Sequence, residues 1–232
     1  MEHNRLVAMK KIKELIKGVV CRSISFWRCV MKFGFIGAGT VAQTLAKHLL
    51  LHGHEVILSN SRGPETLSDL ISSLGAGAKS GTPSEAAEQD FVILCVTWAQ
   101  MPAALSMVPD WTGRVLIDAT NRFENTEPLL GEWSGKNSSE IVAQYAPGAH
   151  VIKAFNSVPM EWIKDYTEEK PKTVLFMSGD DIQVKQVLKE IWEKIGFACI
   201  DLGSLSQGGL LQQIGGPLAG LNLNLLDQYT VR

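Results

Sequence analysis

Short apolar runs alternate with helical patterns along most of this chain. The runs Lys32–Ile36 and Phe91–Val96 are apolar over nearly their whole length, which is typical of strands buried on both faces of a sheet. Between them, residues 40–51 carry apolar side chains at the spacing of one helix face. This alternation predicts an α/β fold with a mostly parallel sheet and helices on both faces. The other predicted strands cover 55–58, 114–119, 150–155, 173–177 and 197–202, and the other predicted helices run from Pro64 to near Gly75, over 82–85, and from Asp181 to Lys194.

A glycine-rich turn joins the first predicted strand to the first predicted helix. It reads Gly37-Ala-Gly-Thr-Val-Ala42, a G-x-G-x-x-A pattern. Here Gly37 permits a tight turn, Gly39 lets the backbone approach a pyrophosphate at the helix N-terminus, and Ala42 allows close packing of helix and strand. The pattern alone is weak, because glycine turns also serve packing. Within a complete βαβ unit of about 30 residues it predicts dinucleotide binding.

The end of the second predicted strand indicates which dinucleotide binds. The chain reads Leu58-Ser-Asn-Ser-Arg-Gly-Pro64 and has no acidic residue before Glu65, whereas an NAD site normally places Asp or Glu there. Ser61 can donate to the extra phosphate of NADP, and Arg62 can pair with it or stack on the adenine. The alternative is an idle arginine in a solvated turn. With the glycine motif upstream, the pattern favours NADP over NAD.

Residues that follow the other strands are expected to face the nicotinamide half of the cofactor, because ligands in such sheets lie beyond the carboxyl ends of the strands. Trp98 can form a wall of a substrate pocket or pack locally. Asn121 and Asn156 can bind the carboxamide or a substrate carbonyl, or cap turns. Lys153 can approach the cofactor, but a solvated lysine at the edge of the sheet is the favoured interpretation. No histidine follows a strand, so the sequence assigns no histidine general acid, no Ser/His/Asp set and no catalytic residue.

Composition narrows the class of protein. The 232 residues are 45% hydrophobic and 20% charged with a net charge of -2, as in ordinary globular proteins. Four scattered cysteines predict no disulfide framework and no metal site, and they indicate a reducing, cytoplasmic compartment. The slightly acidic balance disfavours a nucleic-acid partner. No apolar run has the length of a membrane span.

Residues 1–30 form a separate, basic segment. They hold seven Lys or Arg and two acidic residues, whereas the rest of the chain holds 15 basic and 22 acidic residues. Apolar residues recur at helical spacing from Met9 to Val20 with lysines between them, which predicts a short basic amphipathic helix. The segment can bind an anionic membrane surface or partner, act as a targeting segment, or be upstream sequence in front of a start at Met31. We favour the last interpretation, so a membrane surface is not an expected partner.

The chain carries six short motifs: Met31-Lys-Phe-Gly-Phe-Ile-Gly-Ala-Gly-Thr40, Asn60-Ser-Arg-Gly-Pro64, Asp118-Ala-Thr-Asn121, Val151-Ile-Lys-Ala-Phe-Asn156, Ser178-Gly-Asp-Asp181 and Asp201-Leu-Gly-Ser-Leu205. Together they resemble the NADP oxidoreductases that depend on the deazaflavin coenzyme F-420. The resemblance runs from Met31 to about Leu225, and bacterial NADPH-dependent reductases and the cytosolic domain of STEAP-type metalloreductases share it. It implies a Rossmann fold with a small C-terminal α/β part, often a dimer, that passes a hydride between NADPH and a flavin-like ring.

The resemblance also implies roles for residues at matching positions. Three departures leave the second substrate open: Thr97 and Arg122 stand where proline is usual, and residues 207–212 lack the usual Arg and Glu. The cofactor contacts that it implies, beside Gly37, Gly39 and Asn121, are Ala38, Thr40 and Val41 for the pyrophosphate, Ser61 and Arg62 for the extra phosphate, and Thr97, Trp98, Ala154 and Asn156 for the nicotinamide side.

The sequence therefore predicts an NADPH-dependent oxidoreductase that transfers a hydride between NADP(H) and a flavin-type (deazaflavin or flavin) or other small acceptor. The alternative is an NADP-binding redox sensor or regulatory protein with little turnover. Reduction of an imine or carbonyl would need a proton donor that the sequence does not offer. We expect three parts: the extension 1–30, an NADP-binding Rossmann domain 31–160, and a small C-terminal part 161–232 that completes the acceptor side. The expected partners are a small-molecule hydride acceptor and, by resemblance, a second copy of the chain in a homodimer.

Overall fold

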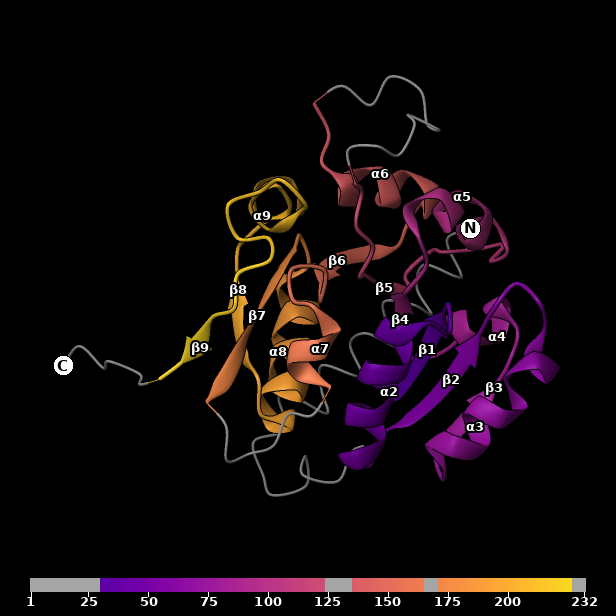
Figure 1. The fold of residues 1–232 in the computed structure, drawn as a ribbon. Helices are drawn as coiled ribbons and strands as arrows, with labels where there is room; N and C mark the ends of the chain where they lie inside the picture. The colour runs from indigo at the N-terminus through magenta and orange to yellow at the C-terminus, as the bar shows by residue number, and fades with distance from the viewer. Residues whose placement is uncertain (1–29, 124–134, 165–170, 227–232) are drawn as a thin grey trace.

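The computed structural model describes residues 30–123, 135–164 and 171–226 (Figure 1). The amphipathic helix predicted within residues 1–30 lies outside this part of the chain and stays a prediction. In the described ranges, no helix has the length and apolar character needed to cross a bilayer.

One sheet runs through the described residues, with its strands in the spatial order β3-β2-β1-β4-β5-β6-β7-β8, and a short β9 also pairs with β7. Every pair from β3 to β6 is parallel, as the apolar runs predict. From β1 the chain adds β2 and β3 on one side of β1. It then crosses to the other side and adds β4, β5 and β6 there, so the strand order reverses between β1 and β4. The strands are β1 Lys32–Ile36, β2 Glu55–Ser59, β3 Ala78–Ser80, β4 Phe91–Leu94, β5 Val115–Asp118, β6 His150–Ala154, β7 Lys172–Gly179, β8 Ala198–Asp201 and β9 Asn224–Leu225.

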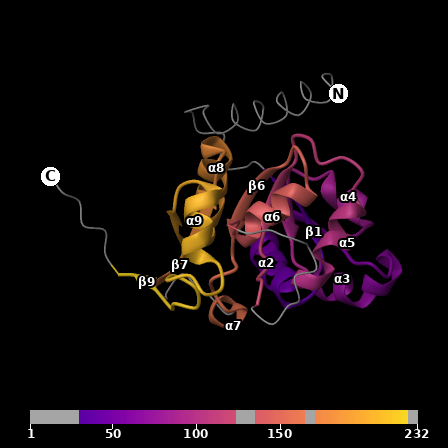
Figure 2. The same ribbon diagram turned by 90° about the horizontal axis from the view of Figure 1, so that it is seen from above.

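Helices cover both faces of this sheet. One apolar cluster joins the sheet to α2, α7 and α8, and a second joins its other face to α4, α5, α6 and the start of α9. Figure 2 shows α9 beside α6. The Rossmann-type α/β fold is therefore confirmed. The helices are α2 Thr40–Leu51, the 3-10 turn η2 Pro64–Leu67, α3 Ser68–Leu74, α4 Pro83–Ala87, the 3-10 turn η3 Trp98–Gln100, α5 Met101–Ser106, α6 Ser138–Tyr145, α7 Met160–Ile163, α8 Ile182–Ile195 and α9 Leu205–Gln212.

The C-terminal part changes the direction of the sheet. β7 runs antiparallel to β6, with Ile152 opposite Gly179, and β8 then runs parallel to β7. As a result α9 starts near the amino end of β6, where the Leu205 N–H donates to Asp180 Oδ1 over 3.0 Å. It ends at the carboxyl edge of β6, where Asn156 Nδ2 donates to the carbonyl of Gln212 over 2.7 Å. The small C-terminal part thus returns a helix to the edge at which the parallel strands end.

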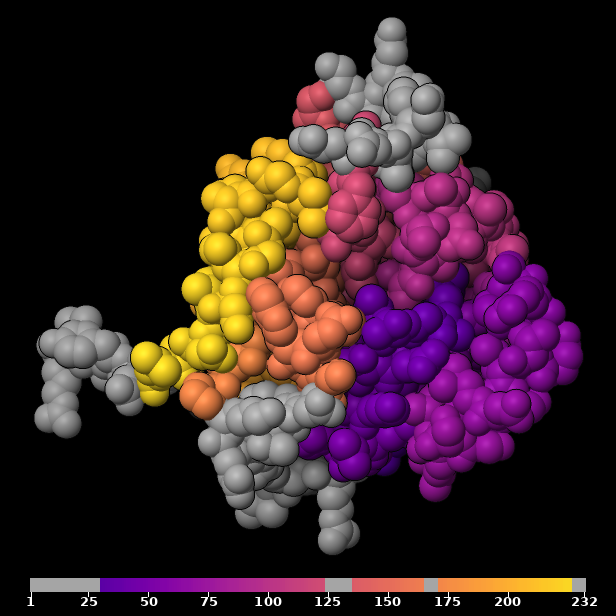
Figure 3. All heavy atoms as spheres, in the orientation of Figure 1, coloured from indigo at the N-terminus to yellow at the C-terminus, as the bar shows by residue number. Residues whose placement is uncertain are grey.

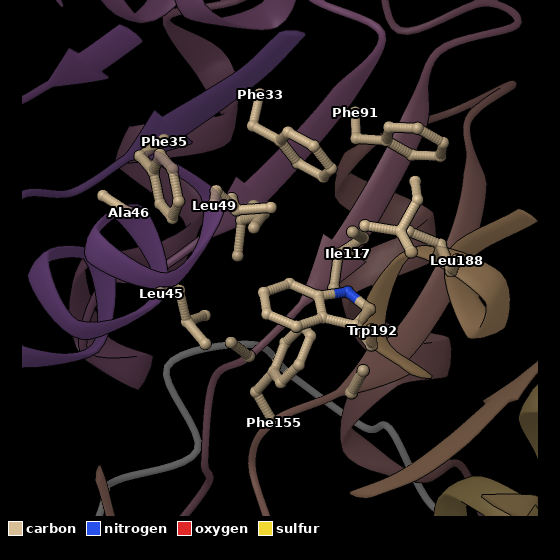
Figure 4. Packing of buried hydrophobic residues seen from close by; sticks show 14 of the residues in the cluster. Phe33, Phe35, Leu45, Ala46, Leu49, Phe91, Ile117, Phe155, Leu188 and Trp192 are labelled. Atoms are coloured by element: carbon tan, nitrogen blue, oxygen red, sulfur yellow. The ribbon is translucent and has the colours of Figure 1, made fainter. Parts of the chain in front are cut away.

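The larger core joins the N-terminal strands to the C-terminal helices (Figure 4). The rings of Phe33 and Phe91 stack with centroids 5.2 Å apart, and Phe155 meets Trp192 of α8 edge-on at 4.6 Å. Figure 3 shows the orange segment packed against the indigo segment around α2, with the yellow C-terminal residues on the other side of the orange segment. Residue 160, the predicted domain boundary, is the first residue of α7, and the sheet is continuous on both sides of it.

Within the described residues every strand and helix predicted from the sequence is present, with ends that differ by a few residues. The capped helix at 82–85 has its full capping box, in which Thr82 and Glu85 exchange hydrogen bonds. The helix at Pro64 begins as a 3-10 turn before α3. The prediction lacked β3, η3, α5, α6, α7, α9 and β9, most of which are too short to show a period.

Candidate functional site

A cleft of about 850 Å³ lies at the carboxyl ends of β1, β2 and β4. In doubly wound sheets the ligand crevice forms where the strand order reverses, which is between β1 and β4 here. Among the described residues, the walls are formed by residues of five segments and two single positions. These are the loop after β1 (36–39), the turn after β2 (60–62), residues 66, 67 and 70, residues 95–97, 99 and 100 after β4, residues 103, 104 and 107 of α5 and its end, Gln43 of α2, and Pro83.

The loop after β1 carries the glycine motif. Gly37 has a φ of 107°, and a Cβ there would lie 2.2 Å from the carbonyl oxygen of Cys95, so the turn requires glycine. A Cβ on Gly39 would meet no atom within 4 Å, which leaves space for a ligand beside it. Gln43 Nε2 donates to the carbonyl of Ala38 over 2.9 Å and fixes the loop. Because Gly39 caps α2 without a side chain, the first N–H groups of the helix can bind an anion.

The turn after β2 is held by Asn60. Its Oδ1 accepts from the N–H groups of Arg62 at 2.9 Å and Gly63 at 3.0 Å, and its Nδ2 donates to Thr66 Oγ1 over 2.9 Å. Ser61 and Arg62 are both exposed on this turn and both line the cleft. Of the described residues that line the cleft, Arg62 alone has a charged side chain. The cleft is therefore suited to an anionic ligand.

The segment after β4 forms the opposite wall. Thr97 caps η3 in a capping box with Gln100, whose Oε1 accepts from Thr97 Oγ1 over 2.9 Å. Trp98 is only 4% exposed and belongs to the apolar cluster beneath α5. The Trp98 side chain therefore packs locally in this cluster, and its indole does not lie on the cleft wall.

A buried ion pair stands at the ends of β5 and β6. The favoured interpretation of Lys153 as a solvated lysine at the edge of the sheet is wrong. The side chains of Lys153 and Asp118 are both 0% exposed, and Lys153 Nζ lies 3.3 Å from Asp118 Oδ2. β6 is an interior strand between β5 and β7, which is why its lysine cannot reach water. The other Asp118 oxygen, Oδ1, accepts from the N–H of Thr120 at 2.9 Å and from its Oγ1 at 2.6 Å. Ser139 of α6 donates to Oδ2 over 2.5 Å.

Three amide side chains link the loops that follow these strands. Asn121 Nδ2 donates to the carbonyl of Asn156 over 2.9 Å, and Asn156 Nδ2 donates back to Asn121 Oδ1 over 3.2 Å. From α9, Gln212 Nε2 donates to Asn156 Oδ1 over 3.0 Å and to the carbonyl of Lys153 over 3.1 Å. The two asparagines therefore bond to each other, Asn156 alone also bonds to Gln212, and neither asparagine lines the cleft.

The described residues of the cleft wall are suited to binding a ligand and offer few groups for acid–base catalysis. No histidine and no carboxylate occur among its described lining residues. Burial, with a smaller contribution from the charge of Asp118, raises the pKa of the Cys95 thiol, so the reactive thiolate is disfavoured at neutral pH. The described part of the chain also holds no group of three His, Cys, Asp or Glu side chains that could bind a metal ion.

The structure places only part of the predicted set in the cleft. Sequence reasoning missed Gln43, Asn60 and Gln100, of which Asn60 had a signal, since Asn before Ser-Arg-Gly is typical of a turn closed by its own side chain. Gln212 gave no local signal at all. Of the predicted cofactor residues, Gly37, Ala38, Gly39, Ser61, Arg62 and Thr97 line the cleft, whereas Thr40, Val41, Trp98, Asn121, Ala154 and Asn156 do not.

Comparison with known proteins gives several matches. A family model described as "NADP oxidoreductase coenzyme F420-dependent" matches residues 32–122, the part that forms the cleft. The structure of the hypothetical protein SMa0349 from Sinorhizobium meliloti is 34% identical with a TM-score of 0.76, over 85% of this chain and 96% of that one. A "putative f420 dependent nadp-reductase" from Arthrobacter sp. FB24 shares the fold, at 24% identity and a TM-score of 0.62 over 75% of this chain and 86% of that one.

Curated relatives include the metalloreductase STEAP3 of Rattus norvegicus, which is 28% identical over 184 residues. That match covers 79% of this chain and 36% of the relative, so the chain spans little more than a third of the length of the curated relatives that it matches. Together with the glycine loop and the Arg62 turn, the family match supports NADP(H) binding in the cleft.

Proposed function

Because the chain belongs to the family of NADP oxidoreductases that depend on coenzyme F420, we propose that it transfers a hydride between NADP(H) and a small acceptor of flavin type. One observation carries the choice of NADP over NAD. Arg62 is the only charged side chain among the described residues that line the cleft, and it stands on a turn that Asn60 holds in place. A guanidinium there favours the extra phosphate of NADP, and the described lining residues include no carboxylate to hold the ribose of NAD.

The residues present fit such a cofactor. The N-terminus of α2 would bind the pyrophosphate, since Gly39 leaves open space and no side chain caps the helix. Ser61 and Arg62 would hold the extra phosphate, and the segment after β4 would lie against the nicotinamide half. When bound, NADPH supplies the hydride. The chain's own residues would bind the cofactor, orient it and exclude water from one side of it.

The absence of acid and base groups from the described cleft wall bears on the acceptor. Carbonyl or imine reduction requires a proton from the protein or a positioned water, and the one lining thiol, Cys95, has a raised pKa. Hydride transfer between two rings depends chiefly on position. A deazaflavin or flavin is therefore the acceptor class that this cleft suits best. Homodimer formation, which the family resemblance implies, stays a prediction.

The assignment of Arg62 can be tested by changing it to alanine. We expect Arg62→Ala to weaken NADPH binding by about 1 to 3 kcal/mol, the range for a charge-assisted contact, and to leave NADH binding nearly unchanged. Lys47→Ala removes the same charge from the exposed side of α2 and serves as the control. Equilibrium titration of all three proteins with both cofactors is the measurement. An equal loss for NADPH and NADH would contradict the assignment.

The acceptor can be found by following NADPH absorbance with the full-length protein and a panel of oxidants. The panel contains deazaflavin, FMN, FAD and ferric chelates, the last because the named curated relatives are metalloreductases. Rapid oxidation of NADPH by deazaflavin or a flavin is the expected result. Tight binding of NADPH without turnover of any acceptor in the panel would contradict the proposed hydride transfer and favour an NADP-binding sensor.

A further inference from the structure

The buried pair of Lys153 and Asp118 is not explained by stability. Burying two charges removes both from water at a large cost in free energy, and well-packed apolar side chains of similar volume are often as stable or more so. Here the Nζ of Lys153 lies 3.3 Å from Asp118 Oδ2 and 3.3 Å from the carbonyl of Thr120, so neither contact is short. What the pair does achieve is to fix the ends of two neighbouring strands relative to each other.

These strand ends lie next to the cleft. Asp118 pairs in register with Leu94 of β4, and the N–H of Ala119 donates to the Leu94 carbonyl over 3.2 Å. The next residue of β4, Cys95, is on the cleft wall. Neighbouring strands are about 4.8 Å apart, so a ligand that begins at the turn after β2 reaches the end of β5 after three spacings, about 14 Å. An extended dinucleotide would therefore bring its nicotinamide end to the end of β5, one strand spacing beyond the β4 wall of the cleft and next to β6.

The loops at this point form one connected unit. Asp118 holds Thr120 through both its N–H and its hydroxyl, while Gln212 joins the backbone of Lys153 to the side chain of Asn156. Between Lys153 and Asn156 lies Phe155, whose φ of 64° is the only positive value among the described residues other than glycine. Such a conformation is unfavourable for a residue with a side chain and persists only where the surrounding structure imposes it, which is frequent at functional sites.

Helix α9 packs closely on β7, where Ser178 pairs in register with Lys153, and on Asn137 before α6. A Cβ on Gly208 would lie 2.5 Å from Ser178 Cβ, and one on Gly209 would lie 2.8 Å from Asn137 Nδ2. Glycine inside a helix is less stable than alanine. Glycine at both positions permits this close packing of α9. One turn later, the side chain of Gln212 bonds to the Lys153 carbonyl of β6.

We propose that Lys153, Asp118 and Gln212 are positioning residues, which hold the loops after β5 and β6 against the nicotinamide end of bound NADPH. The inference rests on the proposed function. It gives the C-terminal part a role in the reaction, because α9 supplies Gln212. None of the three side chains lines the cleft, so each acts through the loops and not by touching the cofactor.

The test separates the two ends of the cofactor. The variants are Gln212→Met, which removes the amide donors with little change in volume, and the double change Lys153→Met with Asp118→Asn, which leaves no unpaired charge. The control is Lys185→Met with Asp201→Asn, because Lys185 is also buried and its Nζ lies 2.8 Å from Asp201 Oδ1, away from the cleft. Binding of NADPH is compared with binding of 2′,5′-ADP, which lacks the nicotinamide half, and the fluorescence of bound NADPH reports on the nicotinamide ring.

We expect both variants to weaken NADPH about tenfold and to reduce its fluorescence enhancement, while 2′,5′-ADP binds as in the wild type. The control should lower the melting temperature and leave the ratio of the two affinities unchanged. Parallel losses for both ligands, no loss for either, or a control that shifts the ratio equally would overturn the positioning role alone. Wild-type protein that binds neither ligand would overturn the proposed function, and this inference with it.

Discussion

Gly37 and Gly39 stand two residues apart in one loop and have different tasks. Gly37→Ala is expected to destabilise the fold by about 1 to 3 kcal/mol, because it adds a Cβ against the carbonyl of Cys95 at a φ of 107°. Gly39→Val is expected to leave the melting temperature nearly unchanged and to weaken NADPH binding strongly, because its side chain would fill the open space beside the helix N-terminus. Thermal unfolding and NADPH titration of both variants measure the difference. A Gly39→Val protein that binds NADPH normally would exclude a pyrophosphate at this loop.

At the scale of single elements, α8 depends on its N-terminal cap. Asp181 accepts from the N–H groups of Gln183 and Val184, both at 3.0 Å, and lies 2.8 Å from His150 Nδ1. Asp181→Ala is expected to lower the free energy of unfolding by about 1 to 2 kcal/mol, as a lost helix cap does. Asp181→Asn is the matched control, since it keeps the accepting oxygen. Urea denaturation that gives both variants the same loss would assign the effect to the charge and not to the cap.

Helix α9 shows an element whose existence depends on its neighbours. Its two interior glycines lower its intrinsic helix propensity, and its apolar residues do not gather on one face, so the sequence does not predict it. In the fold, Ser204 caps its first turn, and Asn137 Nδ2 donates to the carbonyl of Leu205 over 2.8 Å. Contacts from distant parts of the chain thus supply what the local sequence lacks.

For the whole molecule, two histidines predict how stability changes with pH. Burial lowers the pKa of both His48 and His54 below 6.5. His48 Nε2 donates to the carbonyl of Ile163 over 2.6 Å and so ties α2 to α7, while His54 Nδ1 accepts from the N–H of Met31 over 3.2 Å. Because the unfolded chain binds protons more readily than the folded chain, their stabilising contribution is complete above pH 6.5 and is lost as the pH falls below it.

We therefore expect the melting temperature to fall when the pH is lowered from 7.5 to 5.5, and His48→Gln with His54→Gln to flatten that dependence. Thermal unfolding of both proteins across this range is the measurement. A decline of equal slope in the double variant would place the responsible groups elsewhere.

The sequence by itself determined the local half of the site. The glycine turn, the acid-free turn at Ser61 and Arg62, and the apolar strands are contiguous patterns, so each can be recognised without knowing what packs on it. Because parallel strands end at one edge, their order along the chain also placed the glycine loop and the Arg62 turn on a common cleft, as the structure has it.

The tertiary structure decided the polar half. Lys153 meets Asp118 across 35 residues, and Gln212 meets the backbone of Lys153 across 59 residues. Lys153 would lie in solvent if β6 were the edge strand of the sheet. It is buried because β7 pairs with the free side of β6 and makes β6 an interior strand. Trp98 likewise turned into the core because α5 lies over it, a helix with no period in the sequence. Such contacts arise from the packing of segments distant in the chain, and residue spacing does not encode which segments those are.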